Sequence, residues 1–224
     1  MSFGTEIFES ARYPFHAAAR ITRELAGAAT IVLTGGTTAE KLYRPLAEAG
    51  AGWSDSEVFF SDERCVPPTD DASNYGMAKR LLLDSVEPKA VHRMRGEDDP
   101  EGSASAYSDE IADDASRGFD LVLLGMGADC HVAAMFPGSP ALDEDDAFSA
   151  AVDRPDGMKG ITLTPPALLN ANKILLIVSG GAKAEAVNRV VRGSEDPRDC
   201  PARLLADHPD ATFLLDEPAA AALS

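Results

Sequence analysis

Apolar and polar positions along this chain follow two different periods. Short runs of β-branched and aliphatic residues predict strands at 30–34, 57–61, 119–124, 160–164, 173–179 and 212–215. Between them, apolar residues recur every three or four positions, which predicts amphipathic helices at 11–25, 39–48, 74–86, 100–115 and 182–191. Strands that alternate with helices are typical of an α/β fold, so we expect three layers: a mostly parallel sheet with helices on both faces.

The length and composition predict a single domain over residues 1–224. A chain of 224 residues with 45% hydrophobic content can form one sizeable core, and no low-complexity linker divides it. Two stretches rich in Pro, Asp or Gly, residues 66–72 and 137–158, are expected to form the most mobile loops. Each of them follows a segment with candidate chemistry.

Charge and cysteine content narrow the class of protein. The net charge of −17 argues against nucleic acid or an anionic membrane as a partner, because either would be repelled. The chain has no apolar run of membrane-spanning length and no secretory signal pattern at its start, so we expect a cytoplasmic protein. Cys65, Cys130 and Cys200 are widely spaced, which favours free thiols over disulfides or a zinc cluster.

The strongest candidate for chemistry follows the apolar run at 119–124. Gly125 and Gly127 come directly after this run, and Asp129 and His131 follow within a few residues. Open parallel sheets bind ligands beyond the carboxyl ends of their strands, so His131 is placed like a general base. The alternative is a tight turn with a structural, hydrogen-bonded histidine.

A second candidate site follows the run at 30–34. Gly35, Gly36, Thr37 and Thr38 lie between this strand and the next helix, where amide and hydroxyl donors and the helix dipole favour a phosphate. The motif has neither the lysine of a Walker loop nor the spacing of a dinucleotide fingerprint, so ATP and NAD are less expected. Alternatively, Thr37 or Thr38 simply caps the helix.

Charged residues follow two further strands. Asp62, Glu63 and Arg64 come after the run at 57–61, and Arg64 could hold a phosphate with Asp62 or Glu63 orienting it or touching sugar hydroxyls. The alternative is a solvated turn, with the later Ser73 as a helix cap. Lys183 follows two glycines at a helix start, where the helix dipole disfavours a cation and a bound anion would compensate. It could equally be an exposed lysine.

These four groups of residues all follow strands of the expected parallel sheet. The carboxyl ends of parallel strands meet at one edge of the sheet. A single pocket formed by all four groups is therefore favoured over four separate structural roles. We expect Thr37, Thr38, Arg64 and Lys183 to hold a phosphate while His131 faces the reacting carbon.

Stretches across nearly the whole chain resemble one known family. They read TGGTTAEKLYRPLA, WSDSEVFFSDERCVPPTDDASNYGMAKRLLL, FDLVLLGMGADCHVAAMFPGS and GITLTPPALLNANKILLIVSGGAKAEAV. These stretches resemble the 6-phosphogluconolactonases, within the wider group that includes glucosamine-6-phosphate deaminase. The Asp62-Glu63-Arg64 cluster with Ser73-Asn74 favours the lactonase branch, since deaminases usually have an aromatic residue where Arg64 stands. The resemblance implies a Rossmann-like, NagB/RpiA/CoA-transferase-like sheet.

The resemblance also implies an activity: metal-independent hydrolysis of 6-phosphoglucono-δ-lactone in the oxidative pentose phosphate route. His131 would activate water, and Asp129 would fix its tautomer or stabilise the imidazolium. The residues implied to bind the substrate and its phosphate are Gly35, Gly36, Thr37, Thr38, Asp62, Arg64 and Lys183. No cofactor is expected, the partner is a phosphorylated sugar lactone, and the protein is expected to be a monomer or a small homo-oligomer.

Three residues depart from the family pattern, which usually has Gly at Cys130, Thr at Val132 and Pro at Ala39. Cys130 would be strained if the backbone there requires a positive φ. Val132 removes a possible hydrogen bond beside the base, and Ala39 is expected to be harmless.

Three alternative functions remain open at this point. One is a hexose-phosphate deaminase or isomerase, and another is a non-catalytic phosphosugar-binding module, which would have no use for Asp129 and His131. A metal hydrolase using Asp62, Asp129 and His131 is less favoured, because one histidine among scattered acids is poor zinc spacing.

Overall fold

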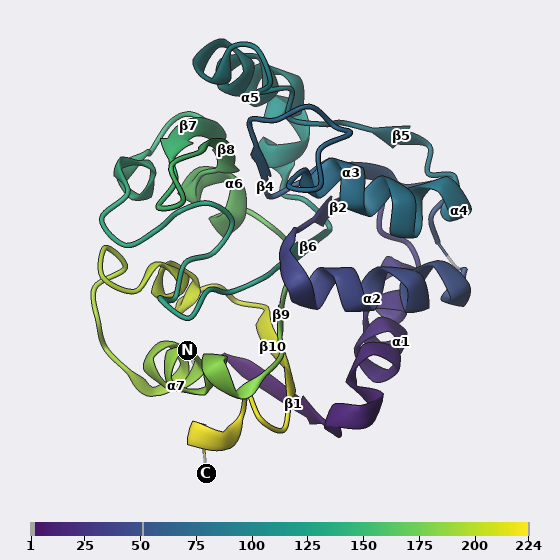
Figure 1. Ribbon diagram of the computed structural model, residues 1–224, viewed down its shortest axis with the longest axis vertical. Coiled ribbons are helices and arrows are strands. Elements are labelled where there is room, and N and C mark those ends of the chain that lie inside the picture. Colours follow the sequence, from purple (N-terminus) through teal and green to yellow (C-terminus); the bar gives the residue numbers. More distant parts are fainter. Residues whose placement is uncertain (1–2, 51, 224) are drawn as a thin grey trace.

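A parallel sheet of seven strands runs through the computed structural model, which describes residues 3–50 and 52–223 (Figure 1). Its strand order is β1-β10-β9-β6-β2-β3-β5, and each pair of neighbours is parallel. The strands are β1 (Gly4–Phe8), β2 (Thr30–Leu33), β3 (Glu57–Phe60), β5 (Ala90–Val91), β6 (Leu121–Leu124), β9 (Ile174–Val178) and β10 (Ala211–Asp216). The α/β class expected from the alternating pattern is confirmed.

Helices cover both faces of this sheet (Figure 1). One face carries α1 (Tyr13–Leu25), α2 (Gly36–Ala49) and the continuous helical segment made of α3 (Asn74–Ala78), a π-helical turn (Lys79–Leu83) and α4 (Asp84–Val86). The other face carries α5 (Pro100–Arg117), α6 (Pro165–Leu169) and α7 (Ala184–Arg192). Alternate residues of each strand enter opposite cores: Leu123 packs toward α1 and α2, whereas Leu124 packs toward α5 to α7.

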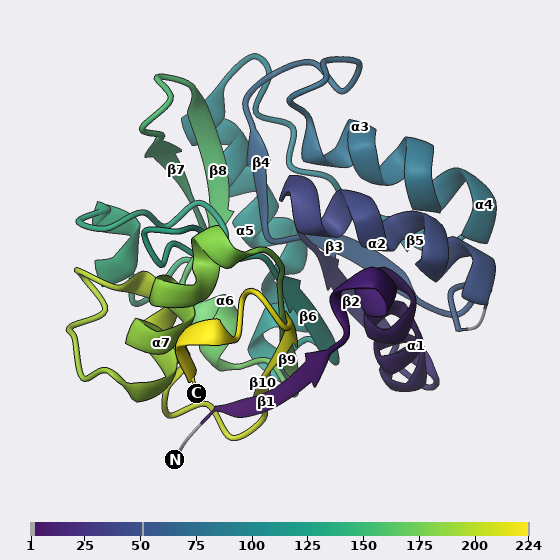
Figure 2. The same cartoon turned by 60° about the horizontal axis from the view of Figure 1, so that its bottom comes forward.

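A second, antiparallel sheet lies beside the first, and it corrects three expectations. Its strands are β4 (Asp62–Arg64), β7 (Ser149–Asp153) and β8 (Lys159–Leu163), in the order β4-β8-β7 (Figure 2). The strand expected at 160–164 exists, but it is not part of the parallel sheet. The charged cluster expected in a loop forms β4, and the stretch expected as a loop at 137–158 contains β7.

Helix boundaries agree with the expected ones to within a few residues. The largest shift is in α2, which begins at Gly36 where residue 39 was expected, so Thr37 and Thr38 belong to its first turn. Short 3-10 turns occupy Ser10–Arg12, Pro140–Asp143, Gly181–Lys183, Pro201–Leu205 and Ala221–Leu223. Within the described ranges, no helix combines the length and the apolar character that a membrane span requires.

The strand order decides where the candidate residues meet. β9, β6, β2 and β3 are consecutive neighbours near the middle of the parallel sheet, and all four point the same way. The segments that follow them therefore leave the sheet at one edge. These are the segments that carry the glycine loop, the Asp62–Arg64 strand, the His131 turn and Lys183.

Candidate active site

One cavity of about 160 Å³ lies at the carboxyl ends of these four strands. Its walls come from segments that are distant in sequence but adjacent at this edge of the sheet. The lining residues are Thr34, Gly35, Gly36, Thr37, Thr38, Asp62, Arg64, Gly125, Met126, Gly127, His131, Ala133, Arg154 and Lys183. Every residue expected to bind the substrate or its phosphate is among them, and so is the expected base.

The glycine loop forms the first turn of α2. Gly35 precedes the helix in an extended conformation, and Gly36 has a φ of 89°, which favours glycine. Neither threonine caps the helix, because the residue at the cap position is Gly35. Instead, Thr38 Oγ1 lies 3.2 Å from Ser179 Oγ at the end of β9, which ties two walls of the cavity together.

His131 and Asp129 form a hydrogen-bonded pair at the end of β6. His131 Nδ1 lies 2.6 Å from Asp129 Oδ1, and the backbone between them is closed by a 2.9 Å hydrogen bond from Gly127 N–H to the His131 carbonyl. Partial burial would raise the pKa of Asp129, but the hydrogen bond and the charge of His131 lower this pKa to about 2. Asp129 supports the ring from outside the cavity lining.

Two neighbours restrict the position of the imidazole. A Cβ atom at Gly127 would stand 2.1 Å from His131 Nδ1 and 2.2 Å from Asp129 Oδ1, so the close pair requires glycine there. The Phe136 ring packs against the imidazole with 4.5 Å between ring centroids. Among the described residues, none is hydrogen-bonded to His131 Nε2, so this nitrogen is available to a molecule in the cavity.

The three departures from the family pattern have different consequences. Cys130 is fully buried and has a φ of 70°, so the condition for strain is met at this position. The Val132 side chain is buried in the core, on the α5 to α7 face of the sheet. Ala39 is buried in α2, after the first helical turn, where a Pro would have no special advantage.

The strand β4 places its three charged residues differently. Asp62 and Arg64 line the cavity, whereas the Glu63 carboxylate is buried and accepts hydrogen bonds at the start of α3. Its donors are Ser73 Oγ and the amides of Arg64, Asn74 and Tyr75, at 2.7–2.9 Å. Glu63 therefore organises the chain around Arg64 and is not placed to touch a sugar hydroxyl. Ser73 does cap α3, as the alternative reading expected.

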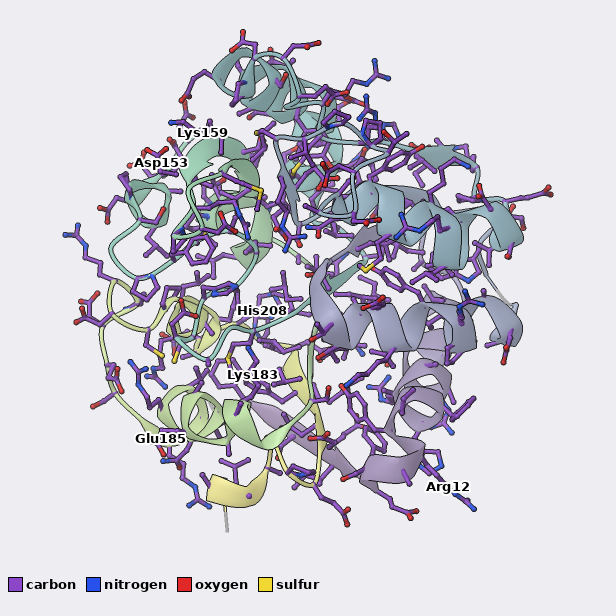
Figure 3. All side chains as sticks on the ribbon, viewed as in Figure 1. Arg12, Asp153, Lys159, Lys183, Glu185 and His208 are labelled. Carbon is purple, nitrogen blue, oxygen red and sulfur yellow. The ribbon has the colours of Figure 1, made fainter. Side chains whose placement is uncertain are left out.

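Lys183 reaches the cavity from the turn between β9 and α7 (Figure 3). The turn depends on Gly180, which has a φ of 97° and whose amide donates to both carboxylate oxygens of Asp216, at 2.9 and 3.0 Å. Asp216 at the end of β10 thus holds the turn that presents Lys183.

Arg154 also lines the cavity, and sequence reasoning missed it. It lies at the tip of the β7–β8 hairpin, its side chain is only 8% exposed, and its Cζ atom stands 5.3 Å from the Phe136 ring centroid. Nη1 lies 3.8 Å from Asp62 Oδ2, and Nη2 lies 3.2 Å from Asp156 Oδ2. Arg154 is recognised as a site residue because its buried guanidinium lines a polar cavity. This position depends on the folded hairpin and could not be inferred from the local sequence.

The charge of the cavity is opposite to that of the chain. Arg64, Arg154 and Lys183 bring three cations to its walls, against one carboxylate from Asp62. The chain as a whole carries −17. A local field of this sign, together with the amides and hydroxyls at the start of α2, suits a small anion. In the part of the chain that is described, no cluster of three or more His, Cys, Asp or Glu side chains could hold a metal ion.

Comparison with known proteins gives this site its context. The sequence profile described as "Glucosamine-6-phosphate isomerases/6-phosphogluconolactonase" matches residues 5–214. The chain belongs to this family. It is 36% identical to the 6-phosphogluconolactonase of Synechocystis sp. over 89% of this chain and 88% of that protein, and 38% identical to that of Mycobacterium tuberculosis over 88% and 86%. The family resemblance expected from the sequence is confirmed.

A solved structure of the same family agrees with the fold. The crystal structure of a 6-phosphogluconolactonase from Shewanella baltica OS155 superposes with a TM-score of 0.84 at 26% identity, covering 96% of this chain and 97% of that one. Family membership covers isomerases as well as lactonases, so the choice between these reactions depends on the side chains in the cavity.

Proposed function

We propose that this protein hydrolyses 6-phospho-D-glucono-1,5-lactone to 6-phospho-D-gluconate, as a cytoplasmic step of the oxidative pentose phosphate pathway. One observation carries the proposal: an imidazole with a free Nε2 and a group of cations open into the same small cavity. Membership in the family and the names of the two relatives above support the same reaction.

The phosphate is assigned to the cationic part of the cavity. The Gly36, Thr37 and Thr38 segment offers amide and hydroxyl donors at a helix N-terminus, and Arg64 and Lys183 add charge. Arg154 is added to this set because its guanidinium lies at the same wall as Asp62. Asp62 then serves to orient the Arg154 guanidinium, since a carboxylate would repel the phosphate itself.

The lactone carbonyl is assigned to the part of the cavity beside His131. Because the ionised Asp129 accepts from Nδ1–H, the lone pair of the neutral ring is on Nε2. Nε2 takes a proton from water, and the water oxygen forms a bond to the carbonyl carbon C1. The bond between C1 and the ring oxygen then breaks, and the proton on Nε2 passes to the departing oxygen. Asp129 stabilises the imidazolium between these two transfers.

The substrate needs little further activation. A δ-lactone is a strained ester, so a positioned base and a fixed orientation are sufficient for hydrolysis at a useful rate. No step requires a metal ion or an organic cofactor. Treatment with EDTA is therefore expected to leave the rate unchanged, and a loss restored by added metal would contradict the mechanism.

The decisive experiment generates the lactone in place. Glucose-6-phosphate dehydrogenase supplies the lactone, and its disappearance is followed with and without this protein, because the lactone also hydrolyses spontaneously. An enzyme-dependent rate well above this background supports the proposal. Conversion of glucosamine 6-phosphate with no effect on the lactone would instead support a deaminase, and binding of 6-phosphogluconate without any turnover would support a binding module.

A further inference from the structure

Asn74 lies behind the cavity wall, at the point where two of the phosphate-binding segments meet. It is the first residue of α3, it is 1% exposed, and it is absent from the cavity lining. Its backbone amide donates to Glu63 Oε1 at 2.7 Å, which fixes the residue in place. The amide side chain is therefore held rigidly, and its contacts are specific.

The side chain of Asn74 connects Arg64 to Asp62 through its two different ends. Oδ1 accepts from Arg64 Nη1 at 2.5 Å, and Nδ2 donates to the Asp62 carbonyl at 2.9 Å and to Asp62 Oδ2 at 3.1 Å. Because a guanidinium only donates and a carboxylate only accepts, this orientation of the amide is the one that satisfies both neighbours. An amide can bridge the two charges without adding one.

This bridge leaves the charge of Arg64 unneutralised. Arg64 also donates to the Ala72 carbonyl at 2.9 Å, and within the described residues it makes no ion pair with a carboxylate. Asp62, at the same wall, lies 3.8 Å from Arg154. Without the amide between them, the nearby Asp62 would attract the Arg64 guanidinium and compete with an incoming phosphate.

The glycine loop is in contact with the same amide. A Cβ atom at Gly35 would stand 1.9 Å from Asn74 Oδ1, and the three atoms nearest to it all belong to this side chain. The backbone of Gly35, with φ −97° and ψ −169°, is extended and would accept alanine. The space next to Asn74, rather than the backbone, is thus what requires glycine at position 35.

We infer that Asn74 is a positioning residue: it holds the Arg64 guanidinium beside the glycine loop and keeps it out of an ion pair with Asp62, so that its charge remains available to the substrate phosphate. The inference rests on the proposed function for the identity of the substrate. It needs only an anion at Arg64, so anion affinity tests it separately from turnover.

The main test changes the charge of this side chain while keeping its shape. In Asn74→Asp, the new carboxylate pairs with Arg64 and repels Asp62, so the Kd for 6-phosphogluconate is expected to rise about tenfold or more while kcat changes much less. Asn172→Asp is the matched control, because it adds the same charge at an exposed position before β9, at the opposite edge of the sheet. Its Kd should stay within about twofold of wild type.

A double-mutant cycle asks whether Asn74 acts through Arg64. In the Arg64→Ala background, Asn74→Asp should add little to the Kd, because the group that it would neutralise is gone. Equal losses in both backgrounds, or an Asn74→Asp variant that binds like Asn172→Asp, would overturn the inference. Inorganic phosphate serves as a second probe, measured by calorimetry on folded protein whose melting curve matches that of wild type.

A second test, of the contact between Gly35 and the Asn74 side chain, applies if Asn74→Asp does not fold. Gly35→Ala displaces the amide from the other side and should weaken 6-phosphogluconate binding several-fold, whereas in an Asn74→Ala background it should have no further effect. Additive losses from the two changes would contradict the inference. Absence of lactone hydrolysis in the wild-type protein would overturn the proposed function instead, and the order of phosphate affinities would still decide the role of Asn74.

Discussion

His131 and Arg64 line the same cavity, but the residues that hold them differ in kind. His131 depends on a partner two residues away, in a single turn closed by two backbone hydrogen bonds, from Gly127 N–H to the His131 carbonyl and from Cys130 N–H to the Gly127 carbonyl. Arg64 depends on Ala72 and Asn74, eight and ten residues further along the chain, and the buried Glu63 carboxylate fixes the backbone of Asn74. The base is thus positioned locally, and the anion-binding part by contacts between elements.

The two kinds of support predict which kinetic quantity each part of the site should control. A local turn can be altered without moving the cations, so changes near His131 should act on kcat and spare binding. The network around Arg64 joins the glycine loop, β4 and α3, so changes there should act on KM and Kd.

The largest effect is expected for His131→Ala. Removing the base should lower kcat by about 10²- to 10⁴-fold, while the Kd for 6-phosphogluconate stays within about threefold of wild type. Rates are measured above spontaneous hydrolysis, and affinity by calorimetry. His16→Ala, at an exposed histidine of α1, is the control and should behave like wild type. Unchanged turnover in His131→Ala would remove this residue from the mechanism.

A smaller decrease in kcat is expected for Asp129→Asn. The variant keeps the shape of the side chain but presents an amide to Nδ1, which no longer selects the productive tautomer, so kcat should fall about a hundredfold. The lowered pKa of Asp129, about 2, reflects a pairing that is present above the ordinary carboxyl pKa of about 4 and is lost only as the pH falls toward 2. The loss should therefore appear at pH 6 and at pH 8 alike. A defect confined to one of them would contradict this role.

Arg154→Ala should affect mainly the Kd, whereas the two preceding variants affect mainly kcat. Loss of a nearly buried guanidinium that faces the cavity should raise the Kd for 6-phosphogluconate about tenfold to a hundredfold, with a smaller change in kcat. Arg12→Ala removes the same charge at an exposed position before α1 and is the control (Figure 3). If kcat fell and the Kd did not, Arg154 would belong with His131 rather than with Arg64.

The contrast between local features and contacts between distant elements also explains what the sequence could predict about the fold. The central strands β6 and β9 are buried along their whole length, so they appear as uninterrupted apolar runs. The edge strand β1 is largely exposed, β4 consists of three charged residues, and β7 is made mostly of polar or small residues. Nothing in their local pattern distinguishes such strands from loops, because their pairing partners are supplied by the rest of the fold.

The residues of the candidate site also fall into those that the sequence could predict and those that it could not. His131, Asp129, the glycine loop and Lys183 follow strands that were visible in the sequence, so the geometry of a parallel sheet was enough to bring them together. Arg154 lies in the segment Asp-Arg-Pro-Asp-Gly, which by itself indicates only a polar turn. The bridging role of Asn74 was hidden for a similar reason, since its neighbours at 35, 62 and 64 meet only in the folded protein.

The smallest effect is expected at Cys130, where a local feature of the His131 turn can be tested without touching its chemistry. Its positive φ costs a non-glycine residue about 1 kcal/mol, and Cys130→Gly removes this cost together with a buried thiol. The net change in unfolding free energy should be within about 1 kcal/mol, with kcat within about twofold of wild type.

Comparing Cys130→Gly with Cys130→Ala isolates the contribution of the backbone, because both variants lose the thiol and only alanine keeps the conformational penalty. At an ordinary position alanine is the more stable of the two residues, whereas here glycine should be more stable by about 1 kcal/mol in denaturant unfolding. Cys200→Ala, at a position without positive φ, removes the buried thiol that contacts Cys130 and measures the loss of this contact and its packing without any change in backbone strain. If Cys130→Ala were the more stable variant, the turn would have relaxed out of its left-handed conformation. The close packing of His131 and Asp129 against Gly127 would then not depend on this backbone conformation.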